Sequence, residues 1–353
     1  AWERFIEVNN VSITEPQQQL LRSLFAVSPF IARVAERYPT QLLTDFFASE
    51  NDISLDSSDT YESSLRRLLE ECKDDRRAKY KLREYRHCIM AKLAAADILG
   101  QLSLSEALEH FSVFADGAIQ ESLQWAFKRL QEKHGTPIGN DGEAMPMLVI
   151  GMGKLGGKEL NFSSDIDLIF AYPEQGETQG PGRNLEHSVF YKRLAQLLIA
   201  LLDETTADGQ VFRVDMRLRP FGQSGPLVTS MNALEHYYQE QGRDWERYAM
   251  VKARLIGASD SDEKAFYDLI RPFVYRRYID FSAIEALRKM KLLITQETRR
   301  RGVKNNIKLG AGGIREVEFI VQAHQLIRGG QEKSLQTRSL YTAVKGLIEL
   351  ELI

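Results

Sequence analysis

The sequence contains little cysteine, with only Cys72 and Cys88 among 353 residues. Two cysteines do not favour a disulfide framework, and we expect two buried thiols in a reducing compartment. No run approaches the roughly 20 apolar residues of a membrane span. The start, AWERFIEVNN, also lacks the basic and apolar segments of a secretory signal. These absences predict a cytoplasmic protein that does not bind a membrane.

The chain carries little net charge, −3 at neutral pH, which does not favour nucleic acid as a partner. The charge is uneven, however, because residues 271–308 contain three acids and eleven basic residues, namely Arg271, Arg276, Arg277, Arg288, Lys289, Lys291, Arg299, Arg300, Arg301, Lys304 and Lys308. A solvated helix face and a phosphate-facing surface both explain such a run.

The length predicts two or three domains rather than one core. Residues 15 to about 131 show helical periodicity, with Leu65 and Leu69 on one stripe and a capping box from Ser103 to Glu106. A Gly- and Pro-rich turn or linker follows at 134–146. The chain starts without Met and stops within helix-forming sequence, so we expect a segment of a longer protein.

Strand patterns begin after this turn, at MLVIG (147–151), DIDLIFAY (165–172) and VFRVDMRLRP (211–220), with a helical pattern at 190–204. From Met231 onward the pattern is helical again. We therefore expect a mostly helical α+β protein with a small mixed sheet. The predicted domains are a helical region at 1–133, a core at 134–258 and a second helical region at 259–353.

Two aspartates lie inside the second strand pattern. Residues two apart on a strand point the same way, so Asp165 and Asp167 are expected on one face. Carboxylates this close repel unless one takes up a proton or a cation lies between them. Mg²⁺ prefers such hard oxygen ligands and commonly shares them with substrate phosphates.

A third aspartate strengthens this interpretation. Alternation along 211–219 places Asp215 on one strand face with Arg213, Arg217 and Arg219. A carboxylate flanked by arginines suits a site that holds both a metal and a phosphate chain. The alternative is a pair of edge strands whose polar faces are joined by salt bridges.

The stretch GMGKLG (151–156) also matches the dinucleotide-binding pattern G-x-G-x-x-G. A dinucleotide site needs a helix and then a buried parallel strand that ends in an acid, for which Glu174 is the candidate. The intervening KLGGKELNFSS is short and contains two adjacent glycines, which are poor helix formers. The Walker A pattern fails too, because Gly157 and Lys158 are followed by Glu159 instead of Ser or Thr.

The remaining interpretation is a glycine-rich turn whose backbone N–H groups bind phosphate beside a two-carboxylate strand. This layout resembles the polymerase-β-like nucleotidyltransferase superfamily. The expected phosphate- or nucleotide-binding residues are Gly153, Gly156, Gly157, Ser163, Ser164, Arg217, Arg219, Lys252 and Arg254. Lys252 and Arg254 are expected on one helix, WERYAMVKAR. The GAGG turn at 310–313 is either an anion-binding helix start or a packing turn, and Glu316 and Glu318 receive no role.

Four longer motifs, GMGKLGGKELNFSSDIDLIF, VDMRLRPFGQSGPLV, RDWERYAMVKAR and NIKLGAGGIREVEFIVQ, resemble the glutamine synthetase adenylyltransferase family. Members contain two nucleotidyltransferase domains, and KLGAGGIREVEF resembles the deadenylylating, N-terminal one. The resemblance implies Mg²⁺ held by Asp165, Asp167 and Asp215. It also implies phosphorolysis of adenylyl-tyrosine on glutamine synthetase by inorganic phosphate, with release of ADP.

Three other functions stay open at this point. The same fold could run the forward, ATP-dependent adenylylation of glutamine synthetase. It could also be a regulatory module with a vestigial site that docks the PII signalling protein, with or without a uridylyl group. The last alternative is an NAD-binding oxidoreductase. None of the six histidines has a spacing that indicates zinc or a catalytic base.

Overall fold

The computed structural model describes residues 2–8, 13–44, 46–49, 52–180, 184–277, 281–300, 306–308, 310 and 312–353, without the side chains of 281–283 and 297–299. The chain divides into two compact units. The first unit comprises 1–133, 159–165 and 193–214, and the second comprises 134–158, 166–192 and 215–353. The three domain ranges expected from the sequence stay predictions.

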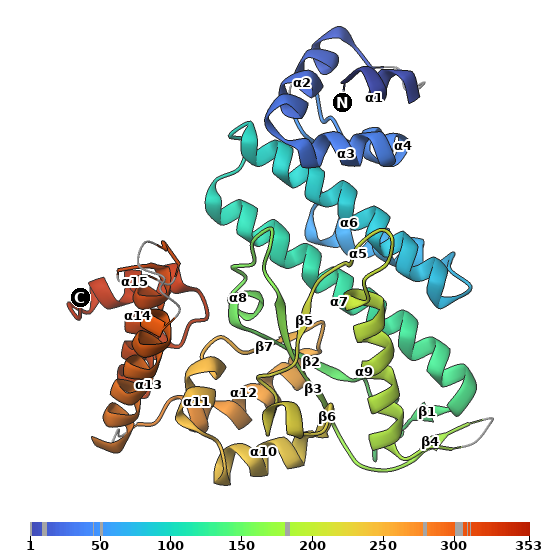
Figure 1. Cartoon of the computed structure of the whole chain (residues 1–353). Coiled ribbons are helices and arrows are strands. Elements are labelled where there is room, and N and C mark those ends of the chain that lie inside the picture. The colour runs from blue at the N-terminus through green and yellow to red at the C-terminus, as the bar shows by residue number, and fades with distance from the viewer. Residues whose placement is uncertain are drawn as a thin grey trace. The chain divides into compact units, whose positions relative to one another are not determined.

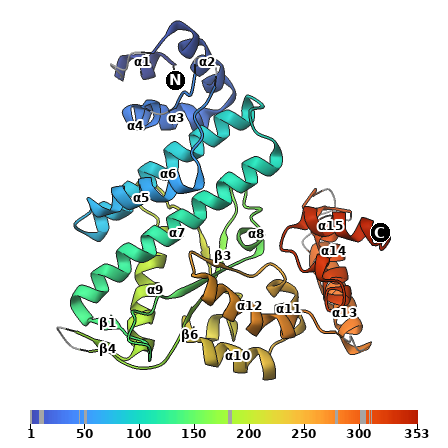
Figure 2. The same ribbon diagram turned by 180° about the vertical axis from the view of Figure 1, so that it is seen from behind.

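The first unit is helical, as its periodicity predicts. Its helices are α1 (Trp2–Val8), α2 (Glu15–Val27), α3 (Pro29–Arg37), α4 (Pro39–Leu43), α5 (Ser58–Glu70), α6 (Asp75–Ile98) and α7 (Leu104–His134). The predicted capping box is confirmed, because the Ser103 N–H donates to Glu106 at 2.8 Å and the Glu106 N–H donates to Ser103 Oγ at 3.3 Å. Helices α6 and α7 run antiparallel, side by side in both views (Figure 1, Figure 2).

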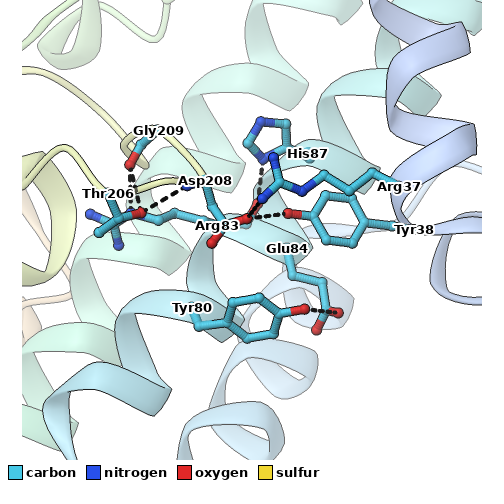
Figure 3. Close-up of polar contacts among 9 residues, drawn as sticks. All are labelled: Arg37, Tyr38, Tyr80, Arg83, Glu84, His87, Thr206, Asp208 and Gly209. Atoms are coloured by element: carbon cyan, nitrogen blue, oxygen red, sulfur yellow. Dashed lines mark hydrogen bonds and ion pairs between the residues drawn. The ribbon is translucent and has the colours of Figure 1, made fainter.

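A buried arginine fixes the segment that leaves α9 (His187–Asp203). Arg83 on α6 is fully buried, and its guanidinium donates to the Gly209 carbonyl at 2.8 Å (Figure 3). It also donates to the carbonyls of Leu201, at 3.0 Å, and Glu204. One turn later, Arg86 donates to the Val211 carbonyl at 2.7 Å. Helix α6 thereby holds the backbone that leads from α9 toward residue 214.

Both cysteines are free and buried, as expected. Burial raises the pKa of the Cys88 thiol to about 12. The thiol has a higher pKa in the folded chain than in the unfolded chain, so the unfolded chain loses the thiol proton at a lower pH. The neutral, buried thiol therefore contributes to stability at neutral pH, and this contribution is lost as the pH rises toward 12. We expect the native protein to react with a thiol reagent at pH 8 far more slowly than the protein in denaturant, as followed by absorbance. Equal rates in both states would contradict this burial.

The second unit contains the sheet. Its strands are β1 (Thr136–Pro137), β2 (Leu148–Met152), β3 (Ile166–Tyr172), β4 (Thr178–Gln179), β5 (Val214–Asp215), β6 (Val228–Ser230) and β7 (Arg254–Ile256), of which β5 begins at the last residue of the first unit. In the described residues, five of them form one sheet in the order β5-β3-β2-β7, with β6 also paired to β3. The strands predicted at 147–151 and 165–172 are confirmed as β2 and β3.

The direction of these strands decides against the dinucleotide hypothesis. β2 and β3 pair antiparallel, with Met152 opposite Asp167 and Leu148 opposite Ala171. A dinucleotide fold joins its first two strands in parallel through a full helix. Here the connection contains only the single-turn helix α8 (Gly153–Gly156), so the dinucleotide interpretation of GMGKLG is wrong.

The helices of the second unit after residue 230 are α10 (Met231–Glu240), α11 (Asp244–Met250), α12 (Asp260–Val274), α13 (Phe281–Arg300), α14 (Ile314–Arg328) and α15 (Leu340–Glu349), with short 3₁₀ turns at Gly222–Ser224 and Lys333–Leu335. Helices α10 to α14 share a core with the sheet, whereas α15 packs against α14 in a separate apolar cluster. One apolar core joins Ile150 and Ile169 of the sheet to Leu234, Phe266 and Phe319 of α10, α12 and α14. The expectation of a mostly helical α+β protein with a small mixed sheet is confirmed.

Two local predictions are wrong. The strand expected over 211–220 is limited to Val214–Asp215, because the chain turns at 217–220 and Arg219 donates to the carbonyls of Met216 and Gly225 in its own loop. Lys252 and Arg254 do not share a helix either, since α11 ends at Met250. Among the described residues, no helix is long and apolar enough to cross a membrane.

Candidate active site

The glycine turn and Asp167 meet at one edge of the sheet. β2 ends at Met152, opposite Asp167, and the chain then turns at Gly153. Gly153 has a φ of +54°, a conformation that residues with a Cβ rarely adopt. A Cβ added there would lie 2.8 Å from Asp167 Oδ2. The turn is therefore glycine because the Asp167 carboxylate lies directly against it.

Asp215 lies on the strand next to that of Asp167, because β5 is the sheet neighbour of β3. Its carboxylate is held by Arg217, whose Nε donates to Oδ2 at 2.8 Å and whose backbone N–H donates to Oδ1 at 2.8 Å. These hydrogen bonds, above all those from the guanidinium, hold the pKa of Asp215 below its usual range. Asp215 is thus an anion at neutral pH.

Asp165 lies immediately before β3 rather than within it. Its carboxylate forms an ion pair with Arg213, whose guanidinium also donates to the Ser163 carbonyl at 3.0 Å. Ser164 Oγ donates to Asn161 Oδ1 at 2.6 Å. The two predicted serines therefore shape the turn that precedes β3 in this conformation.

The donor chemistry of the three aspartates fits Mg²⁺, which takes carboxylate oxygens and water. Two of these carboxylates are bound instead by guanidinium groups, Asp165 by Arg213 and Asp215 by Arg217. Accordingly, the part of the chain that the structure describes contains no group of three or more His, Cys, Asp and Glu side chains arranged around one ion position.

Gly156 closes the turn against the next strand of the sheet. A Cβ at Gly156 would lie 1.9 Å from the Lys252 carbonyl oxygen and 2.6 Å from that of Gly151, and neither backbone atom can move freely. Arg254, which pairs with Gly151 across β2 and β7, donates its Nη2 to the Leu155 carbonyl at 3.0 Å. Residues 252–254 therefore hold the glycine turn in place.

Replacing Gly156 by Ala tests this close packing. We expect Gly156→Ala to lower the free energy of unfolding by about 2–4 kcal/mol, because the backbone at Lys252 and Gly151 must shift to admit the methyl group. Urea unfolding followed by circular dichroism measures the change. Gly117→Ala on α7 is the control, since its added Cβ meets nothing closer than 3.4 Å, and equal stability of the two variants would contradict the packing.

The other basic candidates also bind groups of the protein. Lys252 Nζ lies 2.7 Å from Glu318 Oε1 on α14. On the 271–308 run, Lys289 pairs with Glu285 and Lys291 with Glu316. Residues 301–305, which include Arg301 and Lys304, and the side chain of Arg299 lie outside the described residues. Phosphate binding by Lys252, Arg217, Arg219 and Arg254 stays a prediction.

In the GAGG motif at 310–313, of which Ala311 lies outside the described residues, Gly312 and Gly313 contact neighbouring groups of the protein. A Cβ at Gly313 would lie 2.5 Å from the Ile307 carbonyl oxygen. The Lys291 ammonium, and after it the Gly312 N–H, which donates to a Glu316 carboxylate oxygen at 2.8 Å, lower the pKa of Glu316. Sequence reasoning left both Glu316 and Glu318 without a role, because their partners lie 25 and 66 residues away and no local pattern reveals them.

The family comparisons agree with this architecture. The family model described as glutamate-ammonia ligase adenylyltransferase matches residues 18–268, and the model described as GlnD PII-uridylyltransferase matches residues 288–353. Similar curated proteins carry the name bifunctional glutamine synthetase adenylyltransferase/adenylyl-removing enzyme. The protein from Idiomarina loihiensis is 73% identical over 100% of this chain and 37% of its own length. The protein from Shewanella loihica is 49% identical over 99% of this chain and 36% of its own length. The protein from Vibrio parahaemolyticus is 56% identical over 83% of this chain and 31% of its own length.

The small mixed sheet, with its glycine turn and the aspartates on its strands, is a nucleotidyltransferase fold. This is also the fold of the family whose model matches the chain. The chain belongs to the glutamate-ammonia ligase adenylyltransferase family, whose model matches well over half of it. It spans about a third of the length of these curated relatives.

Proposed function

We propose that this chain removes AMP from an adenylylated tyrosine of glutamine synthetase by phosphorolysis and releases ADP. One observation carries the proposal: Asp167 on β3 lies against the Gly153 turn, and Asp215 lies on the neighbouring strand. The chain that has this arrangement belongs to the adenylyltransferase family. The resemblance of KLGAGGIREVEF to the deadenylylating half supports this direction. The names of the relatives include both an adenylyltransferase and an adenylyl-removing activity.

The reaction needs positioning and charge stabilisation more than proton transfer. An oxygen of inorganic phosphate forms a new bond to the adenylyl phosphorus, the bond from phosphorus to the tyrosine oxygen breaks, and that oxygen leaves to become the tyrosine hydroxyl. Phosphate is already a competent nucleophile, so the protein has to align it with the leaving oxygen and offset the negative charge.

Different residues of this chain would align the phosphate and offset its negative charge. Asp165, Asp167 and Asp215 would hold Mg²⁺, which when bound neutralises charge on the transferred phosphoryl group. The backbone N–H groups of the Gly153–Gly157 turn would bind phosphate oxygens. Arg217 and Arg213 would release Asp215 and Asp165 and turn to the anionic substrate.

The proposal is tested with adenylylated glutamine synthetase, inorganic phosphate and Mg²⁺, by measuring ADP. We expect ADP release that depends on all three, and its absence would contradict the proposal. A second arm with unmodified glutamine synthetase and labelled ATP distinguishes the forward reaction, which would leave label on the protein.

A role in PII signalling is the second candidate, and the match of residues 288–353 to a PII-uridylyltransferase model favours it. We propose that this helical segment responds to the PII protein, with or without its uridylyl group, while the aspartates perform the chemistry. Tight PII binding without Mg²⁺-dependent nucleotide binding, measured by calorimetry, would instead indicate a regulatory module with a vestigial site.

A further inference from the structure

A buried ion pair joins the edge of the candidate active site to α14. Lys252 Nζ lies 2.7 Å from Glu318 Oε1, and the Lys252 side chain is only 4% exposed whereas that of Glu318 is 29% exposed. An ammonium group is costly to bury unless a carboxylate accompanies it. Glu318 therefore provides the charge that allows Lys252 to lie in the interior at this position.

Lys252 lies beside the end of the glycine turn. Its carbonyl packs directly on Gly156, and Arg254, two residues later, pairs with Gly151 of β2. Asp167 pairs with Met152 at the end of the same strand. The register of β3, β2 and β7 thus brings Asp167, the turn and Lys252 to one edge.

Glu318 and Lys252 belong to segments of the chain that match two different family models. Lys252 belongs to the residues matched by the adenylyltransferase model, 18–268, and Glu318 belongs to those matched by the PII-uridylyltransferase model, 288–353. The adjacent rings of Tyr248 and Phe319 stack at 5.6 Å between α11 and α14. The contact between the two segments therefore combines an apolar stack with one buried charge pair.

We propose that Glu318 is a positioning residue for phosphate binding. By pairing with the Lys252 ammonium it holds residue 252, whose carbonyl packs on Gly156, and so keeps the glycine turn in the position in which its N–H groups bind inorganic phosphate. Occupancy of the glycine turn consequently depends on how α14 is seated. This inference rests on the proposed function and names Glu318, through Lys252, as the part of the helical segment that acts on the site.

Glu316 offers a matched control on the same helix. Its side chain is 32% exposed, close to the 29% of Glu318, and it also pairs with a lysine, Lys291. Lys291 lies on α13 and is 33% exposed, so it keeps access to water when its partner is removed. Glu316→Gln thus breaks an ion pair on α14 without changing Lys252.

The experiment measures ADP release at varied inorganic phosphate for the wild type, Glu318→Gln, Glu318→Asp and Glu316→Gln. We expect Glu318→Gln to raise KM for phosphate about tenfold with a smaller change in kcat, and Glu318→Asp to give an intermediate KM. Glu316→Gln is expected to stay within about twofold of the wild type. Equal KM values for Glu318→Gln and Glu316→Gln, or a lower KM in Glu318→Gln, would overturn the proposal.

Binding of radiolabelled phosphate by equilibrium dialysis separates this inference from the proposed function. If the wild type binds phosphate but releases no ADP, the proposed function fails, and weaker binding by Glu318→Gln alone still supports the role of Glu318. No difference in binding, or no phosphate binding by the wild type, overturns it. If thermal unfolding shows that Glu318→Gln does not fold, Glu318→Asp is measured in its place. A KM for phosphate and a phosphate affinity equal to those of the wild type in Glu318→Asp would then overturn the proposal.

Discussion

Replacing Asp167 by Asn is expected to lower phosphate-dependent ADP release by about a thousandfold or more, the largest effect on activity of any single change considered. Asp167 is the carboxylate that lies on β3 directly against the glycine turn. Asn has the same size but no charge, so the fold is retained while the ligand for a cation is lost. ADP release from adenylylated glutamine synthetase, measured under saturating substrate, gives the change.

Asp97→Asn is the control, because Asp97 is exposed near the end of α6. It is expected to keep wild-type activity and stability. Asp165→Asn should also lower activity strongly, since the proposed reaction uses both carboxylates. Intact ADP release in both Asp165→Asn and Asp167→Asn would refute the proposed chemistry.

Replacing Arg83 by Met is expected to produce the largest loss of stability, about 3–5 kcal/mol in the free energy of unfolding. Arg83 is fully buried and donates to the carbonyls of Leu201, Glu204 and Gly209. Met fills much of the same space but leaves these carbonyls without their donor. Urea unfolding followed by circular dichroism measures the effect.

Arg76→Met serves as the control for Arg83→Met, since Arg76 lies on the exposed face of α6. Its effect should stay within about 0.5 kcal/mol. Arg83→Lys is expected to fall between the two, because an ammonium group keeps the charge but cannot reach three carbonyls in the fork geometry of a guanidinium. If Arg83→Met unfolds at the same urea concentration as the wild type, these hydrogen bonds make no net contribution to the free energy of unfolding.

Local patterns in the sequence predicted the elements that local forces determine. The alternation in 165–172 and the apolar run at 147–151 gave β3 and β2, and the capping box at Ser103 gave the start of α7. Each of these signals lies within about ten residues, where side-chain periodicity and capping decide the conformation.

Longer-range features escaped prediction for physical reasons. The alternation over 211–219 imitates a strand, but Arg219 finds acceptors in its own turning loop and only Val214–Asp215 pair. The ion pair of Lys252 with Glu318 spans 66 residues. Salt bridges on these strand faces were the alternative to a metal site, but the pairs Arg213–Asp165 and Arg217–Asp215 could not be named from the sequence, because partner choice among nearby charges depends on the folded backbone.

The antiparallel pairing of β2 with β3 has a consequence for the order in which the site forms. This hairpin closes a short loop, so Asp167 and the glycine turn can meet early, at a small cost in chain entropy. The bonds of Arg83 to the 201–209 segment close loops of 118 to 126 residues, and the bond of Arg254 to Leu155 closes one of 99. We therefore expect Asp167 to meet its turn earlier in folding than Asp215 and Lys252 reach their places in the sheet.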